Sequence, residues 1–416
     1  MYNLSVRHER RLLWLLALTQ FTVIVDFMVM MPLGPQIMGH FAVSPAAFAT
    51  LVSAYSWCSG ISGLFAATYI DRFDRRKMLL VVYGLFALSN LMCAIAPTFG
   101  LLVVARSFAG LTGGVLTALI LTIVSDVIPA VRRGAATGVV MTAVSLAAVA
   151  GVPAGVLLGA HFGWSMPFFL LVVMSVLIWA VGAKLVPSIN QHLAQTRPGL
   201  NQVLPQLWRL ISLPKHMTAF ALMFIVMASH MMVVPFIAPM LVANHDVPPA
   251  QLSWLYMAGG AAMFFTARLS GRLADRYGKK RVFRIVALVS AIPILFMTHM
   301  PSIPYIALLL FFPCFMVCMN ARFVPLQALF TTVPDPVERG AFLSANGAVQ
   351  SLGMGFGAWV GGFMLTSAAD GKIEGYGTIG WVATAMIVIA VLWVGRVKTV
   401  KTNTPQTAEI VAEPAP

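Results

Sequence analysis

The chain has 416 residues, of which 59% are hydrophobic and only 10% are charged. Soluble domains carry about 25% charged residues, so this composition excludes a water-soluble globule. Repeated apolar stretches of about 18 residues or more indicate an integral membrane protein with many helical spans. The formal net charge of +14 would suggest a nucleic-acid partner in a soluble protein. Here the basic residues cluster in short loops on one side, and we expect no nucleic acid to bind.

Twelve apolar runs follow one another along the chain. Six lie in the first half, at about residues 12–38, 46–70, 78–97, 99–128, 134–160 and 164–186. Six lie in the second half, at about 216–242, 250–272, 282–300, 303–333, 340–366 and 377–396. We expect each to be a helix, because a bilayer demands that every backbone polar group be paired within the protein. The first run follows Arg7–Arg11 but lacks a cleavage signature, so we expect an uncleaved span.

The loops between these runs differ in charge. Lys and Arg fill the N-terminus and every second loop, including 72–77, 132–133 and 268–284, as well as the tail from Arg396. The intervening loops contain none, except for Lys372 beside Asp370 and Glu374. By the positive-inside rule, we expect a multi-pass protein of the cytoplasmic (inner) membrane with both termini in the cytoplasm.

The two halves of the sequence repeat one another. Asp71 and Asp275 begin similar basic segments 204 residues apart, and Asp26 aligns with His230 at the same offset. Parallel repeats imply a pseudo-two-fold axis along the membrane normal, with the substrate site between the halves. The predicted fold class is an all-α membrane protein with twelve transmembrane helices in two pseudo-symmetric six-helix bundles.

The repeat also predicts the domain boundaries. We expect an N-terminal bundle at 1–186, a cytoplasmic linker at 187–215, a C-terminal bundle at 216–396 and a disordered cytoplasmic tail at 397–416. Within the linker, Leu200–Leu213 is either a helix in the membrane interface or plain connecting chain.

A basic hairpin follows the second apolar run of each half. The second-half hairpin reads Gly-Arg-Leu-Ala-Asp-Arg-Tyr-Gly-Lys-Lys-Arg from Gly271 to Arg281, and the weaker first-half copy runs from Asp71 to Lys77. The fourth run contains Arg106 followed by Gly110. The fifth contains glycines around a proline, at Gly151, Pro153, Gly155 and Gly159.

These motifs resemble the major facilitator superfamily, and more narrowly its drug- and sugar-efflux proton antiporters of the arabinose-efflux-permease type. The hairpin motif of that family is matched at Gly271, Leu273, Ala274, Asp275, Arg276, Gly278, Lys279 and Lys280. The first-half copy departs from it, with Ala67 and Asp74 where the family has glycine, and Val152 splits the Gly-Pro pair of the antiporter motif.

The resemblance implies that the hairpins lie at the cytoplasmic rim and clamp neighbouring helices. The residues concerned are Asp71, Arg72, Arg75, Gly271, Asp275, Arg276, Gly278 and Lys279. We expect the intact second-half hairpin to be the stronger clamp, acting through Asp275. Asp126, at the inner end of the fourth helix, is expected to pair with the first hairpin.

Four ionisable residues fall deep inside predicted spans. Each costs roughly 2.5–3.5 kcal/mol to insert, so each is a functional candidate. Asp26 and Arg106 reach similar depth when counted at about 1.5 Å per residue, and they are expected to pair or to compete for a proton. His230 repeats the position of Asp26 and either shares in proton coupling or bonds a backbone carbonyl. Arg322 has no acidic neighbour in sequence and is a candidate to bind an anionic substrate group or to pair with Asp26.

The predicted function is secondary active transport by alternating access, with proton-coupled efflux of a small organic compound. A proton symporter that imports a nutrient, or a non-transporting membrane receptor, remains as an alternative. The four cysteines lie in apolar runs without metal-site spacing, and no phosphate-binding loop or nucleophile constellation is present, so we expect no metal, no cofactor and no enzymatic activity. The expected partners are substrate, protons and the lipid bilayer, and the expected assembly is a monomer.

Overall fold

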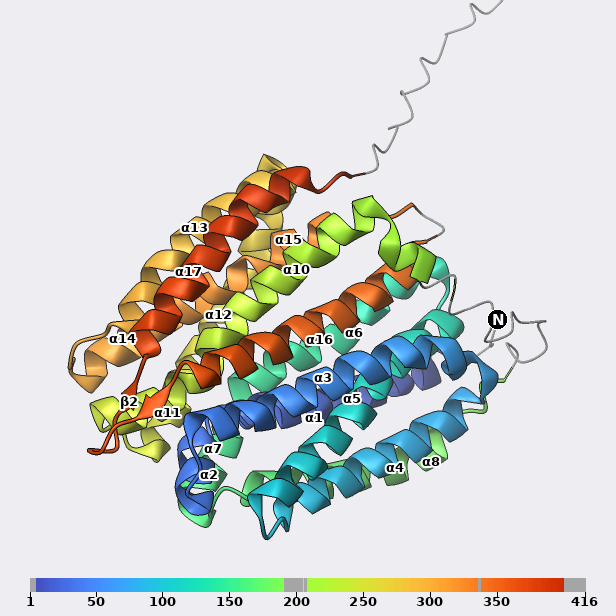
Figure 1. Ribbon diagram of the computed structural model, residues 1–416. Helices are drawn as coiled ribbons and strands as arrows, with labels where there is room; N and C mark the ends of the chain where they lie inside the picture. The colour runs from blue at the N-terminus through green and yellow to red at the C-terminus, as the bar shows by residue number, and fades with distance from the viewer. Residues whose placement is uncertain (1–4, 191–204, 206–207, 336–337, 400–416) are drawn as a thin grey trace, which may run out of the picture.

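The computed structural model describes residues 5–190, 205, 208–335 and 338–399 as a bundle of long helices (Figure 1). The helices of the first half are α1 (Val6–Val29), α2 (Gly34–Phe41), α3 (Pro45–Tyr69), α4 (Arg75–Ala94), α5 (Phe99–Val127), α6 (Arg133–Leu146), α7 (Val152–Phe162) and α8 (Met166–Leu185). Those of the second half are α10 (Pro214–Val233), α11 (Ile237–His245), α12 (Pro249–Tyr277), α13 (Lys279–Thr298), α14 (Tyr305–Ala321), α15 (Phe323–Phe330), α16 (Arg339–Phe363) and α17 (Tyr376–Trp393). Two short antiparallel strands, β1 (Thr366–Ser367) and β2 (Ile373–Glu374), join α16 to α17.

Short polar residues begin several of these helices. The Ser44 hydroxyl accepts a hydrogen bond from the Ala47 amide at the start of α3, and Thr98 does the same for Leu101 at the start of α5. These caps satisfy backbone donors that have no partner inside the helix. They therefore locate the helix ends within a sequence that is apolar almost throughout.

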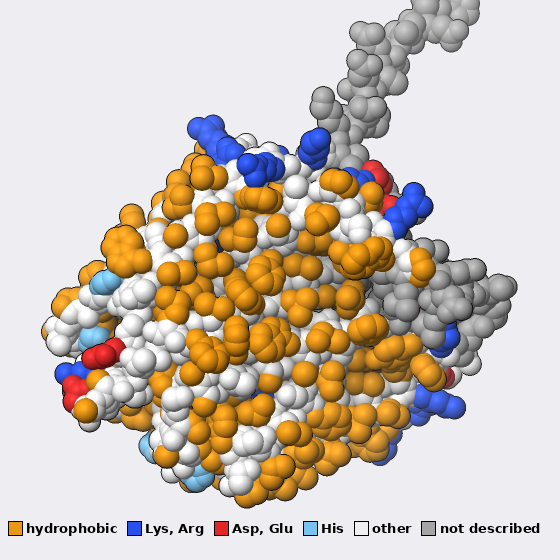
Figure 2. Space-filling model, in the orientation of Figure 1, with side chains coloured by type: hydrophobic (Ala, Val, Ile, Leu, Met, Phe, Trp, Pro, Cys, Tyr) orange, Lys and Arg blue, Asp and Glu red, His pale blue; other side chains and the backbone are white. Residues whose placement is uncertain are grey.

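The hydropathy of the described residues fits a multi-pass membrane protein. Among the residues that the structure describes, nine helical segments are long and apolar enough to cross a bilayer, or ten if the bent pair α2–α3 counts as one span. α12 and α16 do not pass this test, and α16 contains seven glycines among its 25 residues. Figure 2 shows hydrophobic side chains over the middle of the visible face, with most Lys and Arg side chains along its upper and right-hand edges.

Several spans that we expected to be continuous are broken. The first is interrupted at Met30–Leu33, the seventh by a 3-10 turn at Val234–Phe236 and the tenth at Arg322. Proline explains each break, because its ring collides with the carbonyl four residues earlier. Pro32, Pro235 and Pro325 lie at or just after these three breaks, and the fifth span contains a π-helical turn at Ala147–Gly151 just before Pro153.

The two halves contact one another along two seams. In one, α3 and α16 run antiparallel, with Ala49 near Gly362, Trp57 near Gly355 and Gly60 near Ala348. In the other, α12 crosses the π-helical turn of the fifth span. There a Cβ on Gly260 would lie 2.3 Å from the Ala148 carbonyl oxygen, so only glycine permits this approach.

We use "hairpin end" for the end of the bundle that carries the turns at Ile70–Asp74 and Gly278. At the opposite end, α2 and α11 pack together, and Gly34 approaches the ring of Pro239. Most of the predicted linker and the tail from 400 lie outside the described residues. Of the possible interfacial helix at 200–213, residues 208–212 are described and are helical, with Trp208 73% exposed.

Candidate functional site

An ion pair joins α1 to α5 in the interior of the first half. The Arg106 Nη1 atom donates to Asp26 Oδ1 at 2.5 Å, and both side chains are almost completely buried, at 1% and 0% exposure. Within the described residues, Asp26 Oδ2 and Arg106 Nε have no hydrogen-bond partner. The pair therefore neutralises the two charges but leaves one acceptor and one donor free to bind something else.

Tyr55 of α3 covers this ion pair. Its ring centroid lies 4.4 Å from the guanidinium carbon of Arg106, a distance typical of a cation–π contact. The motif of Arg106 followed by Gly110 has a steric reason here, because a Cβ on Gly110 would lie 2.3 Å from the Tyr55 carbonyl oxygen. Gly110 thus lets α3 and α5 approach closely enough for Tyr55 to cover Arg106.

A second cation is buried in the other half, and it has no carboxylate partner among the described residues. Arg322 lies at the break between α14 and α15 and is 1% exposed. Its Nη2 atom lies 3.4 Å from His230 Nδ1 on α10, while Nε and Nη1 have no partner among the described residues. Arg322 does not pair with Asp26 in this conformation. The structure therefore brings His230 and Arg322 together, as it does Asp26 and Arg106.

A cavity of about 1180 Å³ opens between the halves at the hairpin end. It is lined by small and polar residues of α3, α5 and α16, among them Ser59, Gly114, Thr117, Ser344 and Ser351. Toward the opposite end, α3 and α16 close on one another at Gly60, where a Cβ would lie 3.0 Å from the Ala348 carbonyl oxygen. The described part of the molecule is thus open at the hairpin end and packed at the other.

Tyr55 contacts Arg106 and also lies beside a part of α5 that is adjacent to the cavity lining. Its ring faces Arg106, and its hydroxyl lies 2.7 Å from where a Cβ on Gly113 would be. The next residue, Gly114, lines the cavity together with Ser59, which is one helical turn beyond Tyr55 on α3. Tyr55 therefore links the ion pair to the segment of α5 that lines the cavity.

The first hairpin forms an ion-pair network at the cavity rim. Arg75 is 2% exposed and donates to Asp71 at 2.6 Å, to Asp126 at 2.9 Å and to the Ile70 carbonyl at 2.5 Å. The expected pairing of Asp126 with this hairpin is present. Arg72 remains exposed and takes no part in the network.

Asp74, which replaces the second glycine of the motif, caps α4 through the Arg76 amide. Partial burial opposes ionisation of Asp74. Hydrogen bonds from the Ser188 hydroxyl and from backbone amides, including that of Ile189, outweigh this effect and hold the pKa of Asp74 below its usual value. The residue that weakens the sequence motif therefore ties the hairpin to the chain after α8.

The second hairpin differs from our expectation. Asp275 and Arg276 are exposed, and within the described residues neither forms an ion pair with another element. Gly278 has a φ of +90°, which explains the glycine at this turn. Gly271 is on α12, and Lys279 begins α13. In this conformation the paired hairpin is the one with the weaker motif, because Arg75 and Asp126 provide partners that the second hairpin lacks.

The glycines of the fifth span face α1 and not the cavity. A Cβ on Gly151, Gly155 or Gly159 would lie 2.3–2.4 Å from the side chains of Val25, Val29 and Leu33, respectively. Both sets repeat every four residues, so the glycines form a groove that receives a row of side chains from α1 and from the turn after it. Pro153 lies in the first turn of α7, next to the π-helical turn. This packing fixes α1 on both sides of Asp26.

Sequence reasoning missed two residues at the cavity rim. Arg209 and Glu338 line the cavity, and Glu338 lies 3.9 Å from Lys215, which also pairs with Asp335 at 2.5 Å. A pair separated by about 120 positions leaves no local signal in the sequence.

Within the described residues, no group of three or more His, Cys, Asp and Glu side chains could hold a metal ion.

Comparison with known proteins agrees with this architecture. A family model described as Major Facilitator Superfamily matches residues 16–237 and 219–416. An uncharacterized MFS-type transporter, YceJ of Bacillus subtilis (strain 168), is 23% identical over 88% of this chain and 93% of its own. A probable sugar efflux transporter of Helicobacter acinonychis (strain Sheeba) is 22% identical over 85% of this chain and 86% of its own.

Another relative matches over a shorter segment. It is the uncharacterized MFS-type transporter Rv1250 of Mycobacterium tuberculosis (strain ATCC 25618 / H37Rv), 31% identical over 43% of this chain, and the match spans 31% of that protein.

Among solved structures, a bacterial homolog of the human lysosomal transporter Spinster, in an inward-facing and occupied conformation, superimposes with a TM-score of 0.78. It is 15% identical, with 94% of this chain and 97% of that chain covered. A D-xylose-proton symporter superimposes with a TM-score of 0.71 at 17% identity, covering 92% and 96% of the two chains.

Proposed function

The chain belongs to the major facilitator superfamily, and we propose that it exports a small organic compound in exchange for protons. It does so by alternating access across the cytoplasmic membrane, with both termini in the cytoplasm. The observation that carries this proposal is the buried Asp26–Arg106 pair between α1 and α5. The sugar efflux relative supports the direction of transport.

The pair suits proton coupling because its two partners depend on each other. Removing one partner from a buried ion pair costs about 3–5 kcal/mol, since the other charge is left uncompensated. The Asp26 carboxylate, whose Oδ2 atom has no hydrogen-bond partner among the described residues, can take up either a proton or a hydrogen-bond donor of the substrate. Proton and substrate thereby compete for the same carboxylate, as exchange requires.

The substrate site lies between the halves, with Arg322 as its second cationic contact. Two donor atoms of the buried Arg322 have no hydrogen-bond partner in the described part of the chain. Buried guanidinium donors are costly unless they are hydrogen-bonded. We therefore propose that the substrate presents acceptor oxygen atoms, from hydroxyl or anionic groups, to Arg322. In this scheme His230 accepts from Arg322 and orients it.

The open cavity corresponds to the loading step of export. In the proposed orientation the hairpin end faces the cytoplasm, so the 1180 Å³ cavity admits substrate from inside the cell. Closure of the hairpin end and opening of the opposite end would release it. The Arg75 network at the rim is placed to respond to that movement.

The test is transport by the full chain reconstituted in liposomes. A metabolite-export and drug-susceptibility screen of an overexpressing strain against a deletion strain first supplies the compound. An antiporter accumulates it when the liposome interior is acidic, whatever the orientation of the protein. A nutrient symporter accumulates it when the exterior is acidic, and a receptor accumulates it under neither gradient.

The matched variant is Asp26→Asn. The amide oxygen still accepts from Arg106, so the variant should keep its fold and its elution profile, yet lose gradient-driven accumulation. Exchange of substrate for substrate without a gradient should persist. Accumulation by Asp26→Asn equal to that of the wild type would refute the coupling role. Arg322→Gln should instead raise the KM, by about tenfold for the loss of a charged contact.

A further inference from the structure

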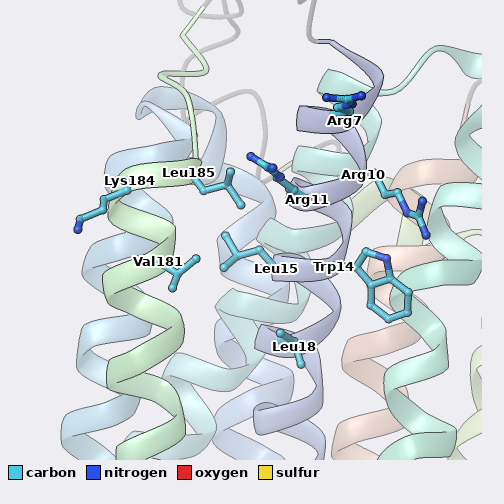
Figure 3. A pocket seen from close by; sticks show the side chains of 9 residues that line it. All are labelled: Arg7, Arg10, Arg11, Trp14, Leu15, Leu18, Val181, Lys184 and Leu185. Carbon is cyan, nitrogen blue, oxygen red and sulfur yellow. The ribbon is translucent and has the colours of Figure 1, made fainter.

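A groove of about 770 Å³ lies between the N-terminal part of α1 and the C-terminal part of α8, apart from the site described above. Figure 3 shows Leu15, Val181 and Leu185 turned into the gap between these helices, with Arg11 above them. Leu15 is 5% exposed, whereas Val181 is 54% exposed. The groove therefore has an apolar floor in the protein and an open side toward the surroundings of the bundle.

Cations surround the mouth of this groove without carboxylate partners. Arg7, Arg10, Arg11 and Lys184 all line it, and among the described residues none of the four pairs with an acidic side chain. The nearest acidic residue in sequence, Glu9, is engaged by Arg132 through two hydrogen bonds of 2.8 and 3.1 Å.

The position of these arginines on α1 increases their need for an anion. Arg7, Arg10 and Arg11 lie in the first two turns of the helix, and Ser5 caps it with an uncharged side chain. A helix N-terminus carries a partial positive charge, so three cations there repel it as well as one another. An anion at the mouth would relieve both effects.

The combination of mouth and floor specifies the chemistry of the ligand. Trp14 is 50% exposed one turn below Arg10 and Arg11, a position typical of the interface between headgroups and acyl chains. The exposed apolar surface of α8 continues the groove along the span, for example at Leu177, which is 61% exposed. A small water-soluble anion would use only the mouth, whereas a lipid uses both parts.

We propose that this groove binds an anionic glycerophospholipid from the leaflet at the hairpin end. The phosphate lies among Arg7, Arg11 and Lys184, and one acyl chain follows Leu15, Leu18 and Val181. The inference concerns a different surface from the transport site and does not rest on proton coupling. Only the statement that this leaflet is cytoplasmic depends on the proposed orientation.

The experiment is native mass spectrometry of the full-length protein in detergent, titrated with dioleoyl phosphatidylglycerol or dioleoyl phosphatidylcholine. We expect the first phosphatidylglycerol to bind at least about tenfold more tightly than phosphatidylcholine, because each cation near an anionic headgroup adds to affinity. The triple variant Arg7→Gln/Arg11→Gln/Lys184→Gln should lose this preference. The control Arg281→Gln/Arg396→Gln/Lys398→Gln removes the same charge from exposed positions of the second half and should keep it.

Further variants and controls test whether the shape of the groove, and not only its charge, is needed for lipid binding, and whether each variant is folded. Val181→Trp fills the groove without changing charge, and it should also weaken phosphatidylglycerol binding. Inorganic phosphate at millimolar concentration should not displace the lipid. Size-exclusion elution matching that of the wild type shows that each variant is folded. Equal binding of the two lipids, unchanged binding by the folded triple variant, or full displacement by phosphate would each overturn the proposal.

Discussion

The Asp26–Arg106 pair should show strong energetic coupling in a double-mutant cycle made of Asp26→Asn, Arg106→Gln and the double variant. The two side chains are 0% and 1% exposed and their atoms lie 2.5 Å apart. Unit charges about 4 Å apart attract by about 4 kcal/mol at an effective dielectric constant of 20. Each single variant leaves an uncompensated buried charge, whereas the double variant leaves none. We therefore expect a coupling free energy of about 2–4 kcal/mol.

The chain supplies its own control pair. Arg132 and Glu9 form a bidentate pair with 2.8 and 3.1 Å bonds, but Arg132 is 54% exposed. An exposed pair contributes about 0–1 kcal/mol, so its coupling should be small. Both cycles are measured by unfolding in mixed micelles of increasing dodecyl sulfate fraction, followed by circular dichroism. If the buried pair couples no more strongly than the exposed one, the reasoning about burial is wrong.

Three further predictions concern packing and the first hairpin. Gly155→Ala places a Cβ 2.4 Å from the Val29 side chain and should lower the free energy of unfolding by about 1–3 kcal/mol in the same micelle assay. Adding Val29→Ala removes the clashing methyl groups and should restore most of the lost stability. Arg75→Gln should lower the melting temperature measured by tryptophan fluorescence, because Asp71 and Asp126 lose their cationic partner. Arg72→Gln, at an exposed residue outside the network, should leave the melting temperature equal to that of the wild type within experimental error. Because the pKa of Asp74 is lowered in the fold, its stabilising effect is present above the unfolded value of about 3.9 and is lost as the pH falls through the folded value. Hydrogen exchange at Ile189, corrected for intrinsic rate, should therefore rise at pH below about 4 in the wild type, and Asp74→Asn should abolish this dependence.

The sequence predicted the long helices and the candidate pair because both depend on local or countable features. Apolar length reveals a span, and equal depth from the two membrane faces brings Asp26 and Arg106 to the same level. The breaks in the first and tenth spans were missed because hydropathy runs through Pro32 and Pro325, although each proline is itself a signal of a break.

The quality of the motif in each hairpin did not predict which hairpin forms ion pairs with other helices. A motif records which residues are present, but not whether a partner such as Asp126 lies opposite them. The second hairpin matches the family pattern more closely, yet the network formed around Arg75. The cavity was equally hidden, since Ser59, Thr117 and Ser351 meet only after three helices have packed. Residues that are distant in sequence come together only through helix packing, so no sequence spacing predicts that they meet.

Tyr55 has a consequence for the energetic efficiency of the proposed exchange. Its ring lies on Arg106, and its hydroxyl lies beside Gly113, the neighbour of the cavity-lining Gly114. In the proposed mechanism, a proton that approaches Asp26 from the cavity along α5 would pass this aromatic side chain. A protein that admitted protons to Asp26 whenever the cavity was wet would dissipate the gradient without moving cargo. Rotation of one side chain, and not diffusion of water, would then set the rate of the futile leak.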